Sequence, residues 1–151
     1  VFTVTIPLQI AEEQIAYIKP SQITEDIFNS LEHLSVLLVE DNEFNRLVAE
    51  DTLKELLPDI RVAIAENGEI ALEKIRKYDY DLVLMDIQMP VMNGVEATKV
   101  IRGTLPENKR DIGIIAMTAN VLQEDVQRYL DAGMNAYISK PFQTDDLLLK
   151  M

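Results

Sequence analysis

Three short, largely apolar runs in this chain each end on charged side chains, and this pattern constrains the fold more than any other feature. The runs and the residues that follow them are 36–39 with Glu40-Asp41, 82–85 with Asp86, and 136–139 with Lys140. Short continuous apolar runs are typical of parallel strands buried on both faces. Because the carboxyl ends of such strands meet at one edge of an open α/β sheet, we expect the three acids and the lysine to gather there.

From Ser35 onward the apolar pattern predicts strands that alternate with helices. The expected strands are 35–39, 61–65, 81–86, 112–117 and 135–139. The expected helices are about 42–57, a segment after Asn67-Gly68, a segment ending at about Arg102, 121–130, and a last one capped by Thr144. Five such repeats with right-handed crossovers predict an α/β fold. We expect a doubly wound five-stranded parallel sheet (flavodoxin-like, order 2-1-3-4-5) with helices on both faces.

Helical spacing and loop residues add local predictions. Residues that share one apolar side are Phe44, Leu47 and Val48 in the first helix, and Leu122, Val126, Tyr129 and Leu130 in the fourth. Gly103 and Pro106 interrupt a polar stretch, so we expect a loop over 103–111. Lys140-Pro141 is a candidate cis peptide.

The first part of the chain differs from the rest. Residues 1–8 alternate apolar and polar side chains and resemble the last strand of another domain. Residues 9–33 are polar and acidic, with a break at Pro20-Ser21, and we interpret them as a linker. We therefore expect one main domain over 34–151.

Composition excludes several classes of protein. The formal net charge of −12 argues against a nucleic-acid partner and against contact with an anionic membrane. No apolar run approaches the roughly 20 residues that a membrane span requires. The absence of Cys excludes disulfides and thiolate metal sites, and is compatible with a cytoplasmic location.

Carboxylates that converge at one sheet edge repel each other unless a cation lies among them. Mg²⁺ prefers oxygen ligands and takes one or two carboxylates from a protein. We expect Asp41 and Asp86 to be direct ligands and Glu40 to act directly or through water. The alternative is that these acids cap the helices that follow, because acidic side chains favour helix N-termini.

Asp86 ends the most apolar strand and is the candidate nucleophile. A carboxylate beside Mg²⁺ can attack a phosphoryl donor and form an acyl phosphate. Lys140 would supply a positive charge to a phosphoryl oxygen, and the Thr118 hydroxyl would bond to another. The alternatives are a surface lysine at 140 and a helix N-cap at 118.

Four motifs in this order resemble the receiver domain of two-component response regulators. They are Val39-Glu40-Asp41-Asn42, the stretch from Met85 to Gly94, Thr118-Ala119, and Lys140-Pro141-Phe142. The resemblance covers about residues 35–151. It implies that Asp86 accepts a phosphoryl group from a phosphohistidine carried by a histidine kinase domain or a histidine-phosphotransfer protein.

The resemblance also implies roles for individual residues. Glu40, Asp41, Asp86 and the backbone carbonyl of Gln88 would organise Mg²⁺, while Thr118 and Lys140 would contact the phosphoryl group. Tyr137 matches the switch aromatic of the family, which changes rotamer as the threonine moves. Gln88 and Asn120 occupy the variable positions that tune phosphoryl lifetime.

The flanking residues resemble those of a hybrid sensor histidine kinase. Residues 1–8 look like the final strand of its ATP-binding domain, and Asn45-Arg46 is similar to receivers fused to such kinases. We therefore expect a C-terminal piece of a hybrid kinase, with any membrane anchor of the parent protein located in its other parts. The piece itself would not turn over a substrate beyond its own phosphorylation and dephosphorylation. His33, the single histidine, is interpreted as a surface or packing residue.

Two other functions remain open at this point. The first is a Mg²⁺-dependent phosphatase or phosphotransferase with an aspartyl nucleophile. Such enzymes commonly place a second Asp two residues after the nucleophile, where this chain has Gln88, which cannot transfer protons. The second is a docking module that works without phosphorylation, against which the complete set of acids argues.

Overall fold

A computed structural model describes Leu31 and residues 33–151 of the chain. The expected strand at 1–8 and nearly all of the 9–33 linker lie outside these residues. The strands are β1 (Ser35–Val39), β2 (Arg61–Ala65), β3 (Leu82–Asp86), β4 (Gly113–Thr118) and β5 (Ala136–Ser139). The helices are α2 (Glu43–Leu56), α3 (Gly68–Lys77), α4 (Gly94–Thr104), α5 (Glu107–Arg110), α6 (Gln123–Asp131) and α7 (Thr144–Lys150).

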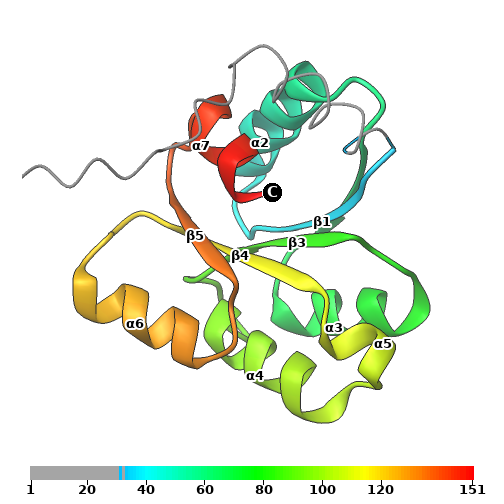
Figure 1. Ribbon diagram of the computed structural model, residues 1–151, viewed down its shortest axis with the longest axis vertical. Helices are drawn as coiled ribbons and strands as arrows, with labels where there is room; N and C mark the ends of the chain where they lie inside the picture. Colours follow the sequence, from blue (N-terminus) through cyan, green and yellow to red (C-terminus); the bar gives the residue numbers. More distant parts are fainter. Residues whose placement is uncertain (1–30, 32) are drawn as a thin grey trace, which may run out of the picture. The chain divides into compact units, whose positions relative to one another are not determined.

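The strands form one parallel sheet in the order β2-β1-β3-β4-β5, which confirms the predicted topology. Figure 1 shows α2 and α7 on one face and α3, α4 and α6 on the other. Val39 pairs with Met85, so Glu40, which follows β1, and Asp86, the last residue of β3, lie at the same level. Thr118 pairs with Ser139, which places Lys140 directly beyond the end of β4.

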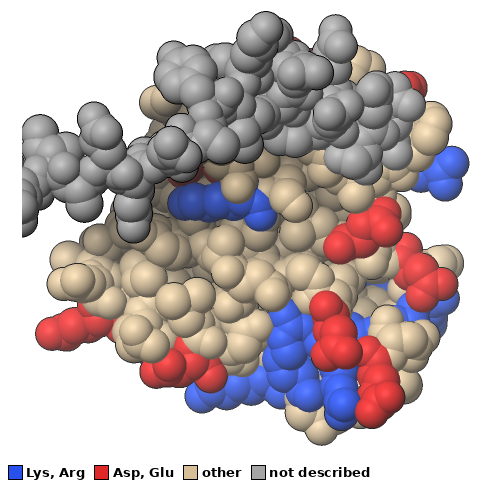
Figure 2. Space-filling view, in the orientation of Figure 1, with Lys and Arg blue, Asp and Glu red and all other residues tan. Residues whose placement is uncertain are grey.

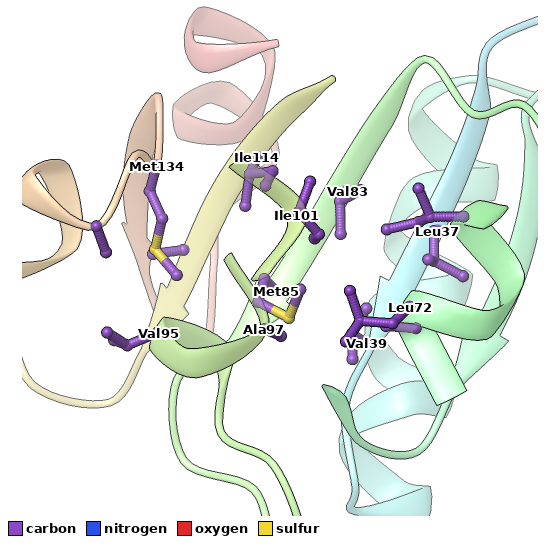
Figure 3. Packing of buried hydrophobic residues seen from close by; sticks show 14 of the residues in the cluster. Leu37, Val39, Leu72, Val83, Met85, Val95, Ala97, Ile101, Ile114 and Met134 are labelled. Atoms are coloured by element: carbon purple, nitrogen blue, oxygen red, sulfur yellow. The ribbon is translucent and has the colours of Figure 1, made fainter. Parts of the chain in front are cut away.

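A cluster of buried hydrophobic residues lies between the sheet and the helices α3 and α4. Leu37 of β1, Met85 of β3 and Ile114 of β4 are fully buried in it. Figure 3 shows these side chains with Leu72 of α3 and Ile101 of α4. Strands without a polar face are held on both sides by helices, and this rigid packing fixes the strand ends that carry the charged residues.

Gly94 lets the start of α4 lie directly against the end of β3. A Cβ atom at this position would overlap the carbonyl oxygen of Asp86 and lie 2.8 Å from the Met85 Cγ. The Gly94 amide donates to the carbonyl of Ile87 at 3.2 Å. Glycine is therefore required here for the close approach of two backbone segments.

The predicted loop over 103–111 is wrong for most of its length. α4 continues to Thr104, and Pro106 precedes the four-residue helix α5. The Pro106 carbonyl accepts hydrogen bonds from the amides of Lys109 and Arg110, both at 2.8 Å. Proline has no backbone N–H, so it leaves no donor without a partner at the start of a helix. Its fixed φ is also compatible with a helix start. Pro106 therefore favours a short helix here rather than a loop.

The predicted apolar helix faces are only partly buried. On α2, Phe44 is 72% exposed and Leu47 56% exposed, while Ala49 and Leu53 face the core. On α6 only Tyr129 of the predicted set is buried. The residues of these two sets that are largely exposed are Phe44, Leu47, Val48, Leu122 and Leu130. Apolar spacing located both helices correctly, but it could not distinguish core contacts from surface.

Two smaller predictions have different outcomes. The Lys140–Pro141 peptide is cis, as predicted. The N-cap of α7 is Gln143, which makes no side-chain cap hydrogen bond, so the prediction that Thr144 caps this helix is wrong. Thr144 is instead its first residue.

Charged side chains on the visible face are mixed in sign. Figure 2 shows Lys and Arg beside Asp and Glu at the lower edge, over the region of α4 and α5. Ion pairs in this region include Lys109 with Asp79 and Arg110 with Glu107. Among the helices in the described part of the chain, none is long and apolar enough to cross a membrane.

Candidate functional site

Three carboxylates meet at the carboxyl edge of the sheet. Glu40 and Asp41 follow β1, and Asp86 ends β3. One oxygen from each of the three side chains lies within 4.8 Å of the others. Glu40 and Asp86 are buried and Asp41 is exposed, so the cluster opens to solvent on one side. These are the distances over which a small cation binds several carboxylates at once.

Lys140 brings a positive charge to this cluster from β5. Its Nζ lies 2.6 Å from Glu40 Oε2 and 3.0 Å from Asp86 Oδ2. Lys140 is therefore not the free surface lysine of the alternative interpretation. Six of the eight expected site residues line one cavity of about 250 Å³; they are Glu40, Asp41, Asp86, Gln88, Thr118 and Lys140.

Burial and charge oppose each other at Asp86. Burial raises the pKa of the Asp86 carboxyl, and its contact with Lys140 only partly offsets this effect. Burial alone lowers the pKa of Lys140, but Glu40 and Asp86 together outweigh burial and raise it. Lys140 therefore stays charged, and Asp86 is a more basic carboxylate than a solvent-exposed one.

Two residues of α2 hold Glu40 in place. The Asn45 side-chain amide donates to Glu40 Oε1 at 2.9 Å. Arg46 Nη1 donates to the backbone carbonyls of Glu40 at 3.1 Å and Asp41 at 3.0 Å. Asn45-Arg46 was expected only as a similarity to receivers fused to kinases, with no role in the site. The signal in the sequence was that both residues lie on the first turn of the helix that follows Glu40 and Asp41.

The acids do not cap the helices that follow them. The N-cap of α2 is Asn42, whose side chain accepts from the Asn45 amide, and the N-cap of α4 is Asn93. Asp86 instead accepts from the Gln88 amide through Oδ1 at 3.2 Å. This removes the alternative in which the acids serve as helix caps.

The Thr118 hydroxyl lines the site cavity but bonds elsewhere. It donates to the Asn120 carbonyl at 2.9 Å and accepts from the Asn120 amide at 3.2 Å. Its oxygen also lies 3.4 Å from the hydroxyl of Tyr129. The N-cap of α6 is Leu122, so the alternative role of Thr118 as that N-cap is wrong. Tyr129 was expected only as a packing residue, because its spacing matches an apolar helix face.

The other expected site residues lie around this centre. Tyr137 is partly buried on β5, with Lys150 Nζ 4.6 Å from its ring centroid. Gln88 and Asn120 are exposed. His33 is exposed in the turn before β1, so β1 separates it from the acids by about 17 Å. His33 lies at the amino end of β1, whereas the carboxylates lie at the carboxyl ends of β1 and β3.

Comparisons with known proteins agree with this arrangement. A family model described as the response regulator receiver domain matches residues 36–151. Two-component response regulator ORR41 of Oryza sativa subsp. japonica is 44% identical over 119 residues, which cover 76% of this chain and 88% of that protein. The aerobic respiration control sensor protein ArcB of Escherichia coli (strain K12) is 38% identical over 151 residues, covering 97% of this chain. The chain spans only 18% of the length of ArcB.

Solved structures give the same picture. The receiver domain of sensor histidine kinase PA1611 from Pseudomonas aeruginosa PAO1, with a magnesium ion coordinated in its active site cleft, is similar with a TM-score of 0.68 and 43% identity. The match covers 76% of this chain and 91% of that chain. A chain from the co-crystal structure of the Saccharomyces cerevisiae phosphotransfer protein Ypd1 with the Ssk1 receiver domain is 31% identical, with a TM-score of 0.67. That match covers 77% of this chain and 84% of that one.

The fold and the acidic site define a doubly wound α/β domain built to handle phosphoryl groups. The chain belongs to the response regulator receiver domain family. It is therefore a receiver domain of a two-component phosphorelay. Receiver domains are phosphorylated by histidine kinases or phosphotransfer proteins.

Proposed function

We propose that Asp86 is the residue that accepts the phosphoryl group. The observation that carries this proposal is the position of Lys140 Nζ, 3.0 Å from Asp86 Oδ2, at the edge of the three-carboxylate cluster. Asp86 is the central acid of the site, and burial makes its carboxylate more nucleophilic by raising its pKa. Asp41 is exposed and Glu40 is already bonded to Asn45 and Lys140.

The donor set fits Mg²⁺. Carboxylate oxygens of Glu40, Asp41 and Asp86 lie close enough to share one hard cation, and the Gln88 backbone carbonyl, next along the same cavity, would complete the protein ligands. When bound, Mg²⁺ would neutralise negative charge on the phosphoryl oxygens. Lys140 alone offers one positive charge against three negative ones, so the apo site favours a divalent ion.

The transfer needs only groups on this chain and the donor. A carboxylate oxygen of Asp86 forms a bond to phosphorus as the bond from phosphorus to the donor imidazole nitrogen breaks, and the nitrogen keeps the electron pair. Lys140 then exchanges part of its contact with Asp86 for a phosphoryl oxygen. The chain thereby carries an acyl phosphate.

Labelling with acetyl phosphate tests this assignment. We expect a mass gain of one phosphoryl group on Asp86 in the presence of Mg²⁺ and none after chelation. Asp86→Asn should abolish the label. Asp79→Asn is the matched control, because Asp79 also pairs with a lysine, Lys109, but lies outside the acidic cluster. Phosphoryl label that persists in Asp86→Asn would refute the assignment.

An exposed apolar surface beside the site supports a protein phosphodonor. Phe44 and Val48 of α2 line a cavity of about 320 Å³ together with Lys140, Pro141 and Phe142. Large exposed apolar side chains next to a polar site mark interaction surfaces. We infer that a phosphohistidine-bearing kinase domain or phosphotransfer protein docks here and brings its imidazole over Asp86.

Two phosphodonors of different size separate docking from chemistry. Phe44→Ala should slow transfer from a phosphorylated histidine-phosphotransfer protein by about tenfold, since interface aromatics each contribute on the order of 1–2 kcal/mol. Transfer from acetyl phosphate should not change. Tyr78→Ala, which removes an exposed aromatic at the opposite end of the sheet, is the control. Equal effects on both donors would contradict a docking role.

We infer that the parent protein is a hybrid sensor histidine kinase with this receiver near its C-terminus. The match to the sensor protein ArcB supports a sensor protein as the parent, because it extends over 97% of the chain, beyond residues 36–151. Hybrid signal transduction histidine kinase K of Dictyostelium discoideum is also 39% identical over 119 residues, which are 10% of that protein. We place the receiver in the cytoplasm, which the absence of Cys favours. Autophosphorylation of the parent from ATP, followed by transfer to Asp86, is the test.

A further inference from the structure

Tyr129 holds the hydroxyl of Thr118 in a position that serves neither the metal nor the phosphoryl group. Both residues are buried, Thr118 with 5% and Tyr129 with 4% of its surface exposed. They come from β4 and α6, and their hydroxyl oxygens are 3.4 Å apart. None of the expected roles of the site requires this contact.

The hydrogen positions can be assigned by counting. Thr118 has one hydroxyl hydrogen, and the shorter bond, 2.9 Å to the Asn120 carbonyl, takes it. Tyr129 must therefore donate in the longer contact. Thr118 Oγ1 also accepts from the Asn120 amide at 3.2 Å, so both of its lone pairs are occupied. The hydroxyl has no free donor or acceptor left for a group on Asp86.

Thr118 and Tyr129 can exchange their hydrogen-bond partners because Tyr129 also borders a cavity. Tyr129 and Thr118 line a cavity of about 440 Å³ that also borders Asn120 and Arg128. A water molecule there can accept from the Tyr129 hydroxyl once Thr118 turns away. Tyr137, which matches the switch aromatic of the family, makes no hydrogen bond to Thr118 within the described part of the chain.

We propose that Tyr129 is a positioning residue that biases Thr118 toward its unphosphorylated orientation and so opposes engagement of the phosphoryl group. The proposal rests on phosphorylation of Asp86. Its physical basis is a hydrogen bond present in one orientation of Thr118 and absent in the other. Tyr129 itself does not touch the acids, so it sets the balance between states without taking part in the transfer.

Binding of beryllofluoride with Mg²⁺, followed by NMR, tests the proposal. Tyr129→Phe keeps the ring and removes the hydroxyl, and it should tighten beryllofluoride binding about two- to fivefold, the range for one modest hydrogen bond. Mg²⁺ affinity should stay the same, whereas a variant that disturbed the structure of the site would change Mg²⁺ affinity as well. Tyr80→Phe, a tyrosine that lines the cavity at the opposite end of the sheet, is the matched control.

A double-mutant cycle isolates the pair. In a Thr118→Ala background, Tyr129→Phe should have no effect on beryllofluoride binding, because the bond is already absent. Unchanged affinity in the single variant, or the same gain in both backgrounds, overturns the proposal. In the wild-type protein, Tyr129 ring resonances should shift when beryllofluoride binds, and a lack of any shift would also overturn it without relying on a variant that folds poorly.

The two proposals fail in different ways. If Asp86 is not the acceptor, the wild-type protein will bind no beryllofluoride with Mg²⁺, or Asp86→Asn will bind it equally well. If only the role of Tyr129 is wrong, beryllofluoride will bind through Asp86 with the same affinity whether or not the Tyr129 hydroxyl is present.

Discussion

Lys140 Nζ lies 2.6 Å from Glu40 Oε2, although the two residues are 100 positions apart in the chain. They follow β5 and β1, two strands that β3 and β4 separate in the sheet. The lysine side chain therefore reaches across the site and passes Asp86. This contact ties the two ends of the site together and neutralises a carboxylate that is 2% exposed.

Lys140→Met should separate the structural and chemical roles of this lysine. Without Mg²⁺, we expect the free energy of unfolding to fall by about 1–3 kcal/mol, because a buried carboxylate loses a hydrogen-bond partner. Mg²⁺ should bind more tightly, since a competing cation is gone. Phosphoryl labelling should fall at least about tenfold, the cost of about 1.4 kcal/mol of lost transition-state stabilisation.

Urea unfolding, Mg²⁺ titration and labelling with acetyl phosphate measure these three effects. Lys109→Met, which removes the partly buried partner of the exposed Asp79, should leave Mg²⁺ affinity and labelling unchanged. Weaker Mg²⁺ binding in Lys140→Met would contradict a direct competition between the lysine and the metal.

Asp86→Asn should raise the melting temperature of the metal-free protein at neutral pH. Burial raises the pKa of Asp86 in the folded protein above its unfolded value, so the ionised carboxylate reduces stability. This loss is present at pH values above the raised folded pKa and is relieved as pH falls through it toward the unfolded pKa. The difference between variant and wild type should therefore shrink with acidification. Melting curves across this pH range measure it, and a constant difference would argue against the carboxylate as its source.

Asn45→Ala should weaken Mg²⁺ binding about tenfold, the lower end of the effect of groups that orient metal ligands. The Asn45 amide fixes Glu40 Oε1 at 2.9 Å, and without it the carboxylate loses its preferred orientation. Calorimetric titration with Mg²⁺ provides the measurement. Thr52→Ala, on the same helix, is the control because its hydroxyl bonds only to the Val48 carbonyl. If both variants bind Mg²⁺ as the wild type does, Glu40 needs no support from α2.

Arg102→Met should destabilise the fold by about 2–3 kcal/mol without affecting labelling by acetyl phosphate. Arg102 Nε donates to the Gly133 carbonyl at 2.9 Å, and Nη2 donates to Asn135 Oδ1 at 2.9 Å. It also contacts the Arg110 carbonyl. One guanidinium thus joins α4 to the end of α5 and to the turn before β5. Urea unfolding measures the loss, and the exposed Arg76→Met provides the comparison.

The sheet and its acidic edge could be predicted because strand order follows from few rules. Continuous apolar runs identified the strands, and the doubly wound order 2-1-3-4-5, which five strands fit, made β1 and β3 neighbours. This was enough to bring Asp41 close to Asp86. The contact of Lys140 with Glu40 could not be predicted in detail, because the reach of a long side chain depends on rotamers that no sequence period encodes.

Other features depended on tertiary context. The exposed apolar residues of α2, such as Phe44, follow the same spacing as core residues, and only the position of the neighbouring helix decides which of them are buried. The contact between Thr118 and Tyr129 needs the crossing of α6 over β4, which spacing along one helix does not report. The helix at 107–110 was missed because Pro106 was interpreted as a breaker rather than as the residue that starts a helix.

The close approach at Gly94 offers a way to silence this domain without altering any ionisable group. A single methyl at that position has nowhere to go except into the peptide of Asp86 itself. Gly94→Ala would keep every acid, the lysine and the overall charge, yet shift the side chain of Asp86, the proposed phosphoryl acceptor, out of alignment. In cells that carry Gly94→Ala, effects that require phosphorylation of the domain would be lost. Effects that require only the presence of the protein would remain.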